Sequence, residues 1–139
     1  MSREPGGTVR FDVAAETAFD YLVDPHHRPE WQSSLRRVDR VDGQPRVGQT
    51  WTDVTKPGLL AAMETTVLER PLLWAESGTW RFVRADLTLQ FAPAGEEACD
   101  VHFRFRIHAL GPLGLVASVL SVPAVRGDLR RAARLLAGR

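Results

Sequence analysis

The segment Leu72–Phe82 combines tryptophans and a carboxylate at a spacing that could serve acid–base chemistry. Side chains alternate across a β-strand, so one face of this segment would carry four side chains: Trp74, Glu76, Trp80 and Phe82. A carboxylate among aromatic rings loses hydration, which raises its pKa and suits it to general acid or base catalysis. In the alternative interpretation Glu76 lies near a strand end or a bulge at Gly78 and reaches solvent or an arginine, because burying an unpaired charge is costly.

A second carboxylate occurs in a similar setting earlier in the chain. Trp51, Asp53 and Thr55 would share one face of a strand over residues 49–56, and Trp51 marks that face as inward. Asp53 is therefore a second candidate acid, with an edge or surface position as the alternative. Met63, on a strand predicted over Leu60–Glu69, is expected to line the same space, where a thioether suits an adaptable site.

The final stretch, Gly111–Arg139, predicts an α-helix of about 25 residues, because apolar residues recur there every three or four positions. Arg126 falls within this apolar stripe, where it could anchor a carboxylate, phenolate or phosphate of a ligand. Alternatively its side chain reaches the edge of the stripe, and a kink at Pro123 would decide where it points. Val116 and Leu120 point off the stripe, so hairpin loops cover them or they form a gate or dimer contact.

Several classes of chemistry find no support in the sequence. Cys99, the one cysteine, excludes an internal disulfide and a cysteine-based zinc site. The adjacent His26 and His27 lack a set of carboxylates, so we expect no metal, and no phosphate-binding or nucleotide-binding glycine motif predicts a cofactor. His102 and His108 fall on the outer face of the last strand. A net charge of +1 gives no electrostatic reason to expect nucleic acid.

The elements that would position these residues follow a simple order. A strand over Thr8–Val13 precedes two short helices, over Ala14–Val23 and His26–Gln32, and about six consecutive strands come next, before the final helix. Such a sheet curls because strands twist, and one helix about 10 Å wide cannot fill its concave face. The space left over predicts a pocket. We expect one domain over residues 1–139, with 1–7 flexible, and a cytoplasmic location because no apolar run is long enough to span a bilayer.

The order of these elements, and certain residues in it, resemble the START/Bet v 1-like (SRPBCC) superfamily and its polyketide cyclase/dehydratase-like bacterial members. The matching stretches are Val9–Phe19, Asp24–Trp31, Val47-Gly48 before Trp51, and Val67–Pro71. The resemblance implies an α+β helix-grip fold, a curved antiparallel sheet of about seven strands around a long C-terminal helix. It also implies a deep apolar cavity. The family shares no universal catalytic residue, so none is carried over, and Glu96–Cys99 replaces the Gly-Thr common before the last strand.

We therefore predict that the protein binds a small, largely apolar molecule. It would be either a cyclase or dehydratase of lyase type, or a non-catalytic carrier or sensor of a lipid-like or aromatic ligand. In the catalytic case Glu76 and Asp53 would move protons. No nucleic acid and no stable membrane insertion are expected, and the protein would be a monomer or homodimer. The expected ligand contacts are Trp51, Met63, Trp74, Trp80, Phe82, Leu89, Phe103, Phe105, Val119, Val122 and Arg126.

Overall fold

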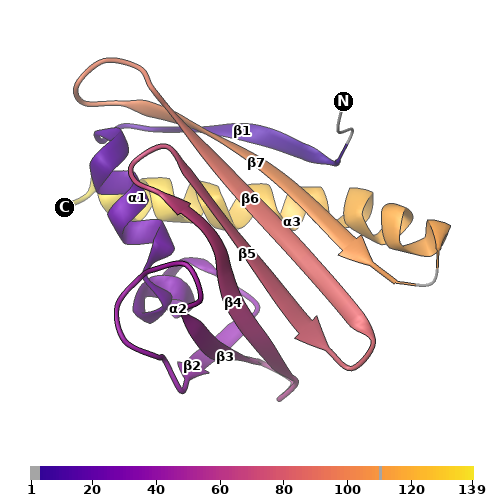
Figure 1. Ribbon diagram of the computed structural model, residues 1–139. Helices are drawn as coiled ribbons and strands as arrows, with labels where there is room; N and C mark the ends of the chain where they lie inside the picture. The colour runs from indigo at the N-terminus through magenta and orange to yellow at the C-terminus, as the bar shows by residue number, and fades with distance from the viewer. Residues whose placement is uncertain (1–3, 110) are drawn as a thin grey trace.

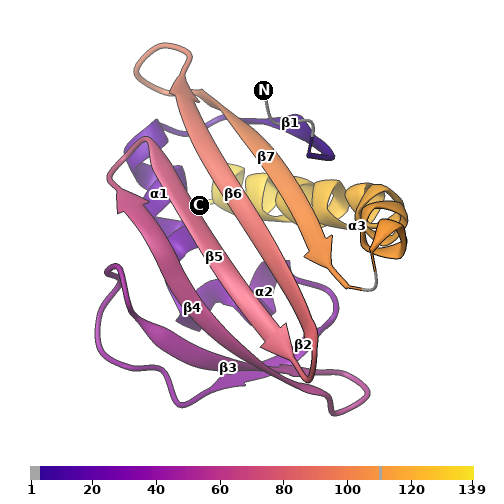
Figure 2. The ribbon, with the colours of Figure 1, turned by 45° about the vertical axis from the view of Figure 1, so that its right-hand side comes forward.

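A seven-stranded antiparallel sheet organises this computed structural model, which describes residues 4–109 and 111–139 (Figure 1). The strand order is β1-β7-β6-β5-β4-β3-β2, so β2 to β7 form a meander and β1 pairs with β7. The strands are β1 (Gly6–Phe11), β2 (Leu35–Asp39), β3 (Thr50–Thr55), β4 (Leu60–Glu69), β5 (Leu73–Trp80), β6 (Val83–Pro93) and β7 (Cys99–His108). The helices lie together on one side of the sheet, as Figure 2 shows. The predicted helix-grip architecture is confirmed.

The alternation predicted for the last two strands forms the centre of the core. Side chains on the inner faces of β6 and β7 meet in three cross-strand pairs, Leu87–Phe105, Leu89–Phe103 and Phe91–Val101. All of these except Phe105 are buried. Burial on one face alone explains why the strands alternate apolar and polar residues.

Short helices follow β1, as predicted, and the second of the two predicted helices is a 3₁₀ turn that continues into a single α-helical turn. Helix α1 (Ala15–Val23) buries an apolar face, and Phe19 meets Phe91 edge to face at a centroid distance of 5.1 Å. The Asp24 side chain then accepts a hydrogen bond from the His26 backbone N–H and caps the short 3₁₀ turn η1 (Pro25–His27). The single turn α2 (Arg28–Trp31) follows directly, which places the side chain of Arg28 beneath the sheet.

The C-terminal helix α3 (Pro112–Ala137) runs for 26 residues without interruption through Pro123. Its C-terminal half packs as predicted, with Leu129 and Leu136 buried. The N-terminal half differs from the prediction, because Gly114 and Ser118 face β7 there while Leu115 and Val119 are exposed. The helix lies too close to β7 for larger side chains: a Cβ on Gly114 would lie 2.5 Å from the Ile107 carbonyl oxygen.

Hydrogen bonds of Ser118 stabilise this close contact between α3 and β7. Its hydroxyl accepts a hydrogen bond from the Ile107 backbone N–H at 2.7 Å and donates to the Gly114 carbonyl at 2.6 Å. Apolar side chains of this half point outward instead, and five of them are 42–74% exposed: Leu113, Leu115, Val116, Val119 and Leu120. Hairpin loops therefore do not cover Val116 and Leu120. By length and composition alone α3 could cross a membrane, although its C-terminal half is packed on the sheet.

The ends of two strands differ from the predicted bounds. Strand β1 begins at Gly6, so Gly6 and Gly7, predicted to be flexible, pair with Arg104 and Phe103 of β7. Residues 1–3 of the predicted flexible segment lie outside the described residues. Strand β5 ends at Trp80, because Arg81 takes a left-handed φ of 55° and turns the chain into β6.

Candidate functional site

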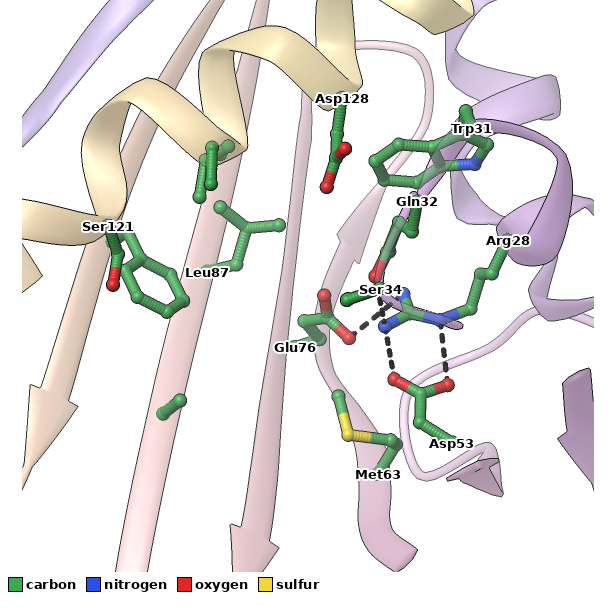
Figure 3. Close-up of a pocket in the computed structure, with 14 residues that line it drawn as sticks. Arg28, Trp31, Gln32, Ser34, Asp53, Met63, Glu76, Leu87, Ser121 and Asp128 are labelled. Carbon is green, nitrogen blue, oxygen red and sulfur yellow. Dashed lines mark hydrogen bonds and ion pairs between the residues drawn. The ribbon is translucent and has the colours of Figure 1, made fainter. Parts of the chain in front are cut away.

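A buried arginine joins two carboxylates on the inner face of the sheet. The Arg28 side chain, 3% exposed, donates from Nε and Nη2 to the two oxygens of Asp53 at 3.1 and 2.7 Å. Its Nη1 lies 3.0 Å from Oε2 of Glu76 (Figure 3). Burial alone would lower the pKa of the guanidinium, but the two carboxylates outweigh it and raise that pKa, so Arg28 stays charged.

Asp53 is held from two directions. Besides the paired hydrogen bonds from Arg28, its Oδ1 accepts one from the indole Nε1 of Trp51 at 3.0 Å. Trp51 also places its ring 5.0 Å from the Arg28 guanidinium carbon. Because both oxygens are engaged by neighbouring side chains, Asp53 is suited to fixing the position of Arg28.

Glu76 is held less completely. Its side chain, 5% exposed, lies beside Arg28, yet the geometry at Oε2 does not meet that of a hydrogen bond. The other oxygen, Oε1, accepts none from any residue that the structure describes. Burial raises the pKa of Glu76 to about 7; Arg28 opposes the rise and the Asp53 carboxylate adds to it. Glu76 therefore changes its protonation state near neutral pH.

Arg28, Asp53 and Glu76 form a buried charged triad, and a cavity of about 280 Å³ lies between this triad and helix α3. It is roughly twice the volume of a cavity of about 150 Å³ known to hold benzene, so a compact one-ring or two-ring molecule would fit. Its polar part is Arg28, Gln32, Ser34, Asp53, Glu76, Ser121 and Asp128, and the rest of the lining is Trp31, Met63, Ala85, Leu87, Phe105, Ala124 and Val125. The cavity thus has an apolar wall and a charged end.

Asp128, which sequence reasoning missed, enters the cavity from α3. It points toward Glu76 in Figure 3, and its Oδ1 accepts hydrogen bonds from the Ser33 backbone N–H at 3.2 Å and hydroxyl at 3.0 Å. Burial raises the pKa of Asp128, while the bonds from Ser33 oppose that rise. The one signal for it in the sequence is its spacing, one helical turn after Val125.

Four of the predicted site residues line this cavity: Asp53, Met63, Glu76 and Phe105. Trp51 supports the triad, as described above. The structure places three more in the packed core, where they are at most 1% exposed: Trp74, Leu89 and Phe103. Val122 packs against the same core and is half-buried.

Four predicted contacts lie away from the cavity. Val119 is 54% exposed because α3 presents Ser118 to the sheet instead. Trp80, at the end of β5, is 37% exposed, and Phe82 lies beyond the strand in the hairpin turn, so the predicted shared face ends at Trp80. Arg126 lies on the other side of the helix, against Gly7 of β1 and 5.9 Å from the Phe103 ring.

The histidines and the cysteine take no part in the cavity. His102 is exposed and bonded to Thr8, and His108 contacts Asp86, in accord with the outward faces predicted for them. Cys99 is buried, which raises the pKa of its thiol to about 11. Within residues 4–109 and 111–139, no group of three or more side chains of the types His, Cys, Asp and Glu could hold a metal ion.

The cavity between sheet and helix agrees with a comparison against known families. Residues 7–139 match the family described as polyketide cyclase/dehydrase and lipid transport. The chain belongs to this family. Its membership confirms the resemblance inferred from the sequence and implies a ligand-binding cavity, although no curated sequence matches the chain significantly.

Solved structures share the family fold at low identity. XoxI from Bacillus cereus is 12% identical, with a TM-score of 0.76 over 96% of this chain and 95% of that one. Norcoclaurine synthase from Thalictrum flavum, in complex with dopamine and hydroxybenzaldehyde, is 10% identical, with a TM-score of 0.75 over 99% and 87%. A START superfamily protein from Mycobacterium smegmatis is 12% identical, with a TM-score of 0.71 over 95% and 97%. At these identities the likeness concerns the fold.

The buried carboxyl of Glu76 predicts a pH-dependent stability. Its pKa rises on folding from 4.5 to about 7, so the folded protein keeps a proton that the unfolded chain has lost in this range. The contribution to stability is therefore complete below pH 4.5 and is lost as the pH rises to 7, a fall of roughly 3 kcal/mol. Urea unfolding of the wild type and of Glu76→Gln over this range should show the fall in their difference. If the difference in unfolding free energy between the two proteins did not change with pH, the raised pKa of Glu76 would be contradicted.

Proposed function

We propose that the protein binds a compact, largely apolar molecule in the cavity and acts on it as a cyclase or dehydratase, with Glu76 as the general acid and base. The observation that carries this proposal is the buried carboxyl of Glu76, which has a pKa of about 7 and an oxygen free of protein hydrogen bonds at the cavity wall. A group that titrates near the working pH both removes and returns a proton efficiently.

The triad gives the carboxylates different roles. Arg28 binds Asp53 through two hydrogen bonds and lies beside Glu76, so Asp53 positions the guanidinium and leaves Glu76 to meet the ligand. In a dehydration, the Glu76 carboxylate would take a proton from a carbon next to a carbonyl. The carboxylic acid so formed would return that proton to the departing hydroxyl, which leaves as water. The apolar wall would hold the substrate and exclude solvent.

Two features of the relatives support this proposal. The family takes its description from cyclases and dehydrases. The structurally similar norcoclaurine synthase was solved in complex with dopamine and hydroxybenzaldehyde, two one-ring compounds of the size proposed for this cavity.

The alternative function is a non-catalytic carrier or sensor of a lipid-like or aromatic ligand. It is favoured by the ion pair between Glu76 and Arg28, which would also be expected if the triad only stabilised the fold. The lipid transport in the family description agrees with it as well. The predicted cytoplasmic location and oligomeric state stay predictions under both functions.

Occupation of the cavity can be tested by native mass spectrometry of protein purified without denaturation. A co-purified small molecule should be observed, and Ala85→Phe should abolish its binding because Ala85 lines the cavity. Ala62→Phe is the matched control, since Ala62 is exposed on strand β4 of the same sheet and does not line the cavity. Equal occupancy in both variants would place the ligand elsewhere and overturn the proposal.

A further inference from the structure

The charges that line the cavity do not balance. The lining contains one guanidinium, that of Arg28, and three carboxylates, those of Asp53, Glu76 and Asp128. Both oxygens of Asp53 are bonded to Arg28, so this pair neutralises itself. Glu76 and Asp128 remain: Glu76 shares Arg28 with Asp53, and Asp128 forms no ion pair with a described residue that lines the cavity.

These two carboxylates come from opposite walls. Glu76 is on β5 and Asp128 on α3, and Figure 3 shows their side chains pointing toward each other across the cavity. Glu76 is only 5% exposed, and its Oε1 accepts no hydrogen bond from the described residues. On Asp128, Ser33 occupies Oδ1.

The other charged groups nearby do not fill this space. Arg28, from α2, is the cation among the residues that line the cavity, and it is already shared between Asp53 and Glu76. The charge of Arg131 on α3 opposes the rise in the pKa of Asp128. The Nε of Arg131, however, donates a hydrogen bond to the Glu30 carbonyl at 2.7 Å, on the exposed side of α2.

We propose that the cavity selects a ligand with a protonated amine, which would lie between Glu76 and Asp128 while the ligand's apolar body lies against Met63, Leu87 and Phe105. This inference rests on the proposed function, since it assumes that the cavity binds a small molecule. An ammonium group donates up to three hydrogen bonds and restores the missing positive charge. An anionic ligand would meet an excess of carboxylates, and its one possible cation, Arg28, is already paired. The chemical class that fits is a small arylalkylamine or cycloalkylamine.

Selection of an amine should be detectable from proton release on binding and from the pH dependence of affinity. The carboxyl of Glu76 holds a proton below a pH of about 7, and an ammonium group would favour its charged form. Amine binding should therefore release a proton near neutral pH, and amine affinity should rise with pH between 6 and about 8, while a neutral ligand shows neither effect. Asp128, whose pKa burial also raises, would face the same ammonium group and would act in the same direction.

Three probes of matched shape test the proposal: 2-phenylethylamine, 2-phenylethanol and 3-phenylpropanoate. Binding can be followed by calorimetry in two buffers of different ionisation enthalpy, and by tryptophan fluorescence, since Trp31 lines the cavity. We expect the amine to bind about tenfold more tightly than the alcohol, with proton release, and the carboxylate to bind most weakly. Asp128→Asn, whose amide oxygen can still accept from Ser33, should lower amine affinity to that of the alcohol and leave alcohol binding unchanged.

Asp20→Asn is the matched control, because Asp20 is paired with Arg70 on the surface and should affect none of the three probes. Equal binding of amine and alcohol, or tighter binding of the carboxylate, would overturn the selection for a cation while leaving the proposed function in place. Failure of all three probes would also overturn it. The proposed function itself fails separately, if Ala85→Phe leaves the co-purified ligand bound.

Discussion

Replacing Arg28 with methionine is expected to lower the free energy of unfolding by about 3–5 kcal/mol at neutral pH. The substitution leaves Asp53 and Glu76, 7% and 5% exposed, without the cation that both contact. Asp53 would keep only the hydrogen bond from Trp51, and a buried charge left without its partner is strongly destabilising. Methionine is apolar, and Glu76, whose pKa Arg28 holds down, would take up a proton in its absence, so the loss would come mainly from the unpaired Asp53 carboxylate and from the lost attraction between Arg28 and Glu76. Urea unfolding followed by tryptophan fluorescence measures the effect.

Arg70→Met supplies the matched control. Arg70 also forms a paired contact with a carboxylate, at 2.8 and 2.9 Å from Asp20, but both side chains are about half exposed. Exposed ion pairs contribute about 1 kcal/mol or less. The loss in Arg28→Met should also shrink in a Glu76→Gln background, where the attraction between Arg28 and the Glu76 carboxylate is already absent. If the two arginine variants lost equal stability, the buried triad would not be what holds this end of the sheet.

The sheet could be predicted from sequence because burial on one face leaves a period of two. The last two strands show it clearly, and Trp51 and Trp74 correctly marked the inner faces that carry Asp53 and Glu76. The partner of these carboxylates could not be predicted. Which of the 18 lysine and arginine residues is buried depends on how α2 folds beneath β3 and β5, 25 and 48 positions along the chain. Nothing local distinguishes Arg28 from an ordinary exposed arginine.

The final helix shows a second limit of prediction from sequence. Periodicity located its buried line, which runs through Leu129 and Leu136, but not which flank of that line faces the cavity. Arg126 and Asp128 lie on opposite flanks, about 160° apart around an ideal helix. The structure turns Asp128 toward the cavity and Arg126 toward β1. The close approach at Gly114 fixes this rotation, and it depends on the path of β7, which a helical pattern alone does not contain.

Glu76→Gln is expected to lower kcat by about 10²–10⁴-fold on the substrate that native mass spectrometry identifies. Glutamine keeps the shape of the side chain and removes the proton that is exchanged, while Asp128 and the apolar wall still hold the substrate. Substrate affinity should therefore change by about tenfold at most. In the wild type the rate of a base-catalysed step should rise with pH and level off above about 7, where Glu76 is ionised. The variant should lack this rise.

Asp86→Asn is the control for this experiment, because Asp86 is an acidic residue of β6 that contacts His108 and Arg84 and does not line the cavity. Its kcat should match that of the wild type. Unchanged turnover in Glu76→Gln would remove the catalytic role of this carboxyl, and with Asp53 committed to Arg28 only Asp128 would remain as an acid in the cavity. Retained binding with no turnover in the wild type would instead favour the carrier or sensor, in which the raised pKa of Glu76 would make ligand affinity depend on pH without chemistry.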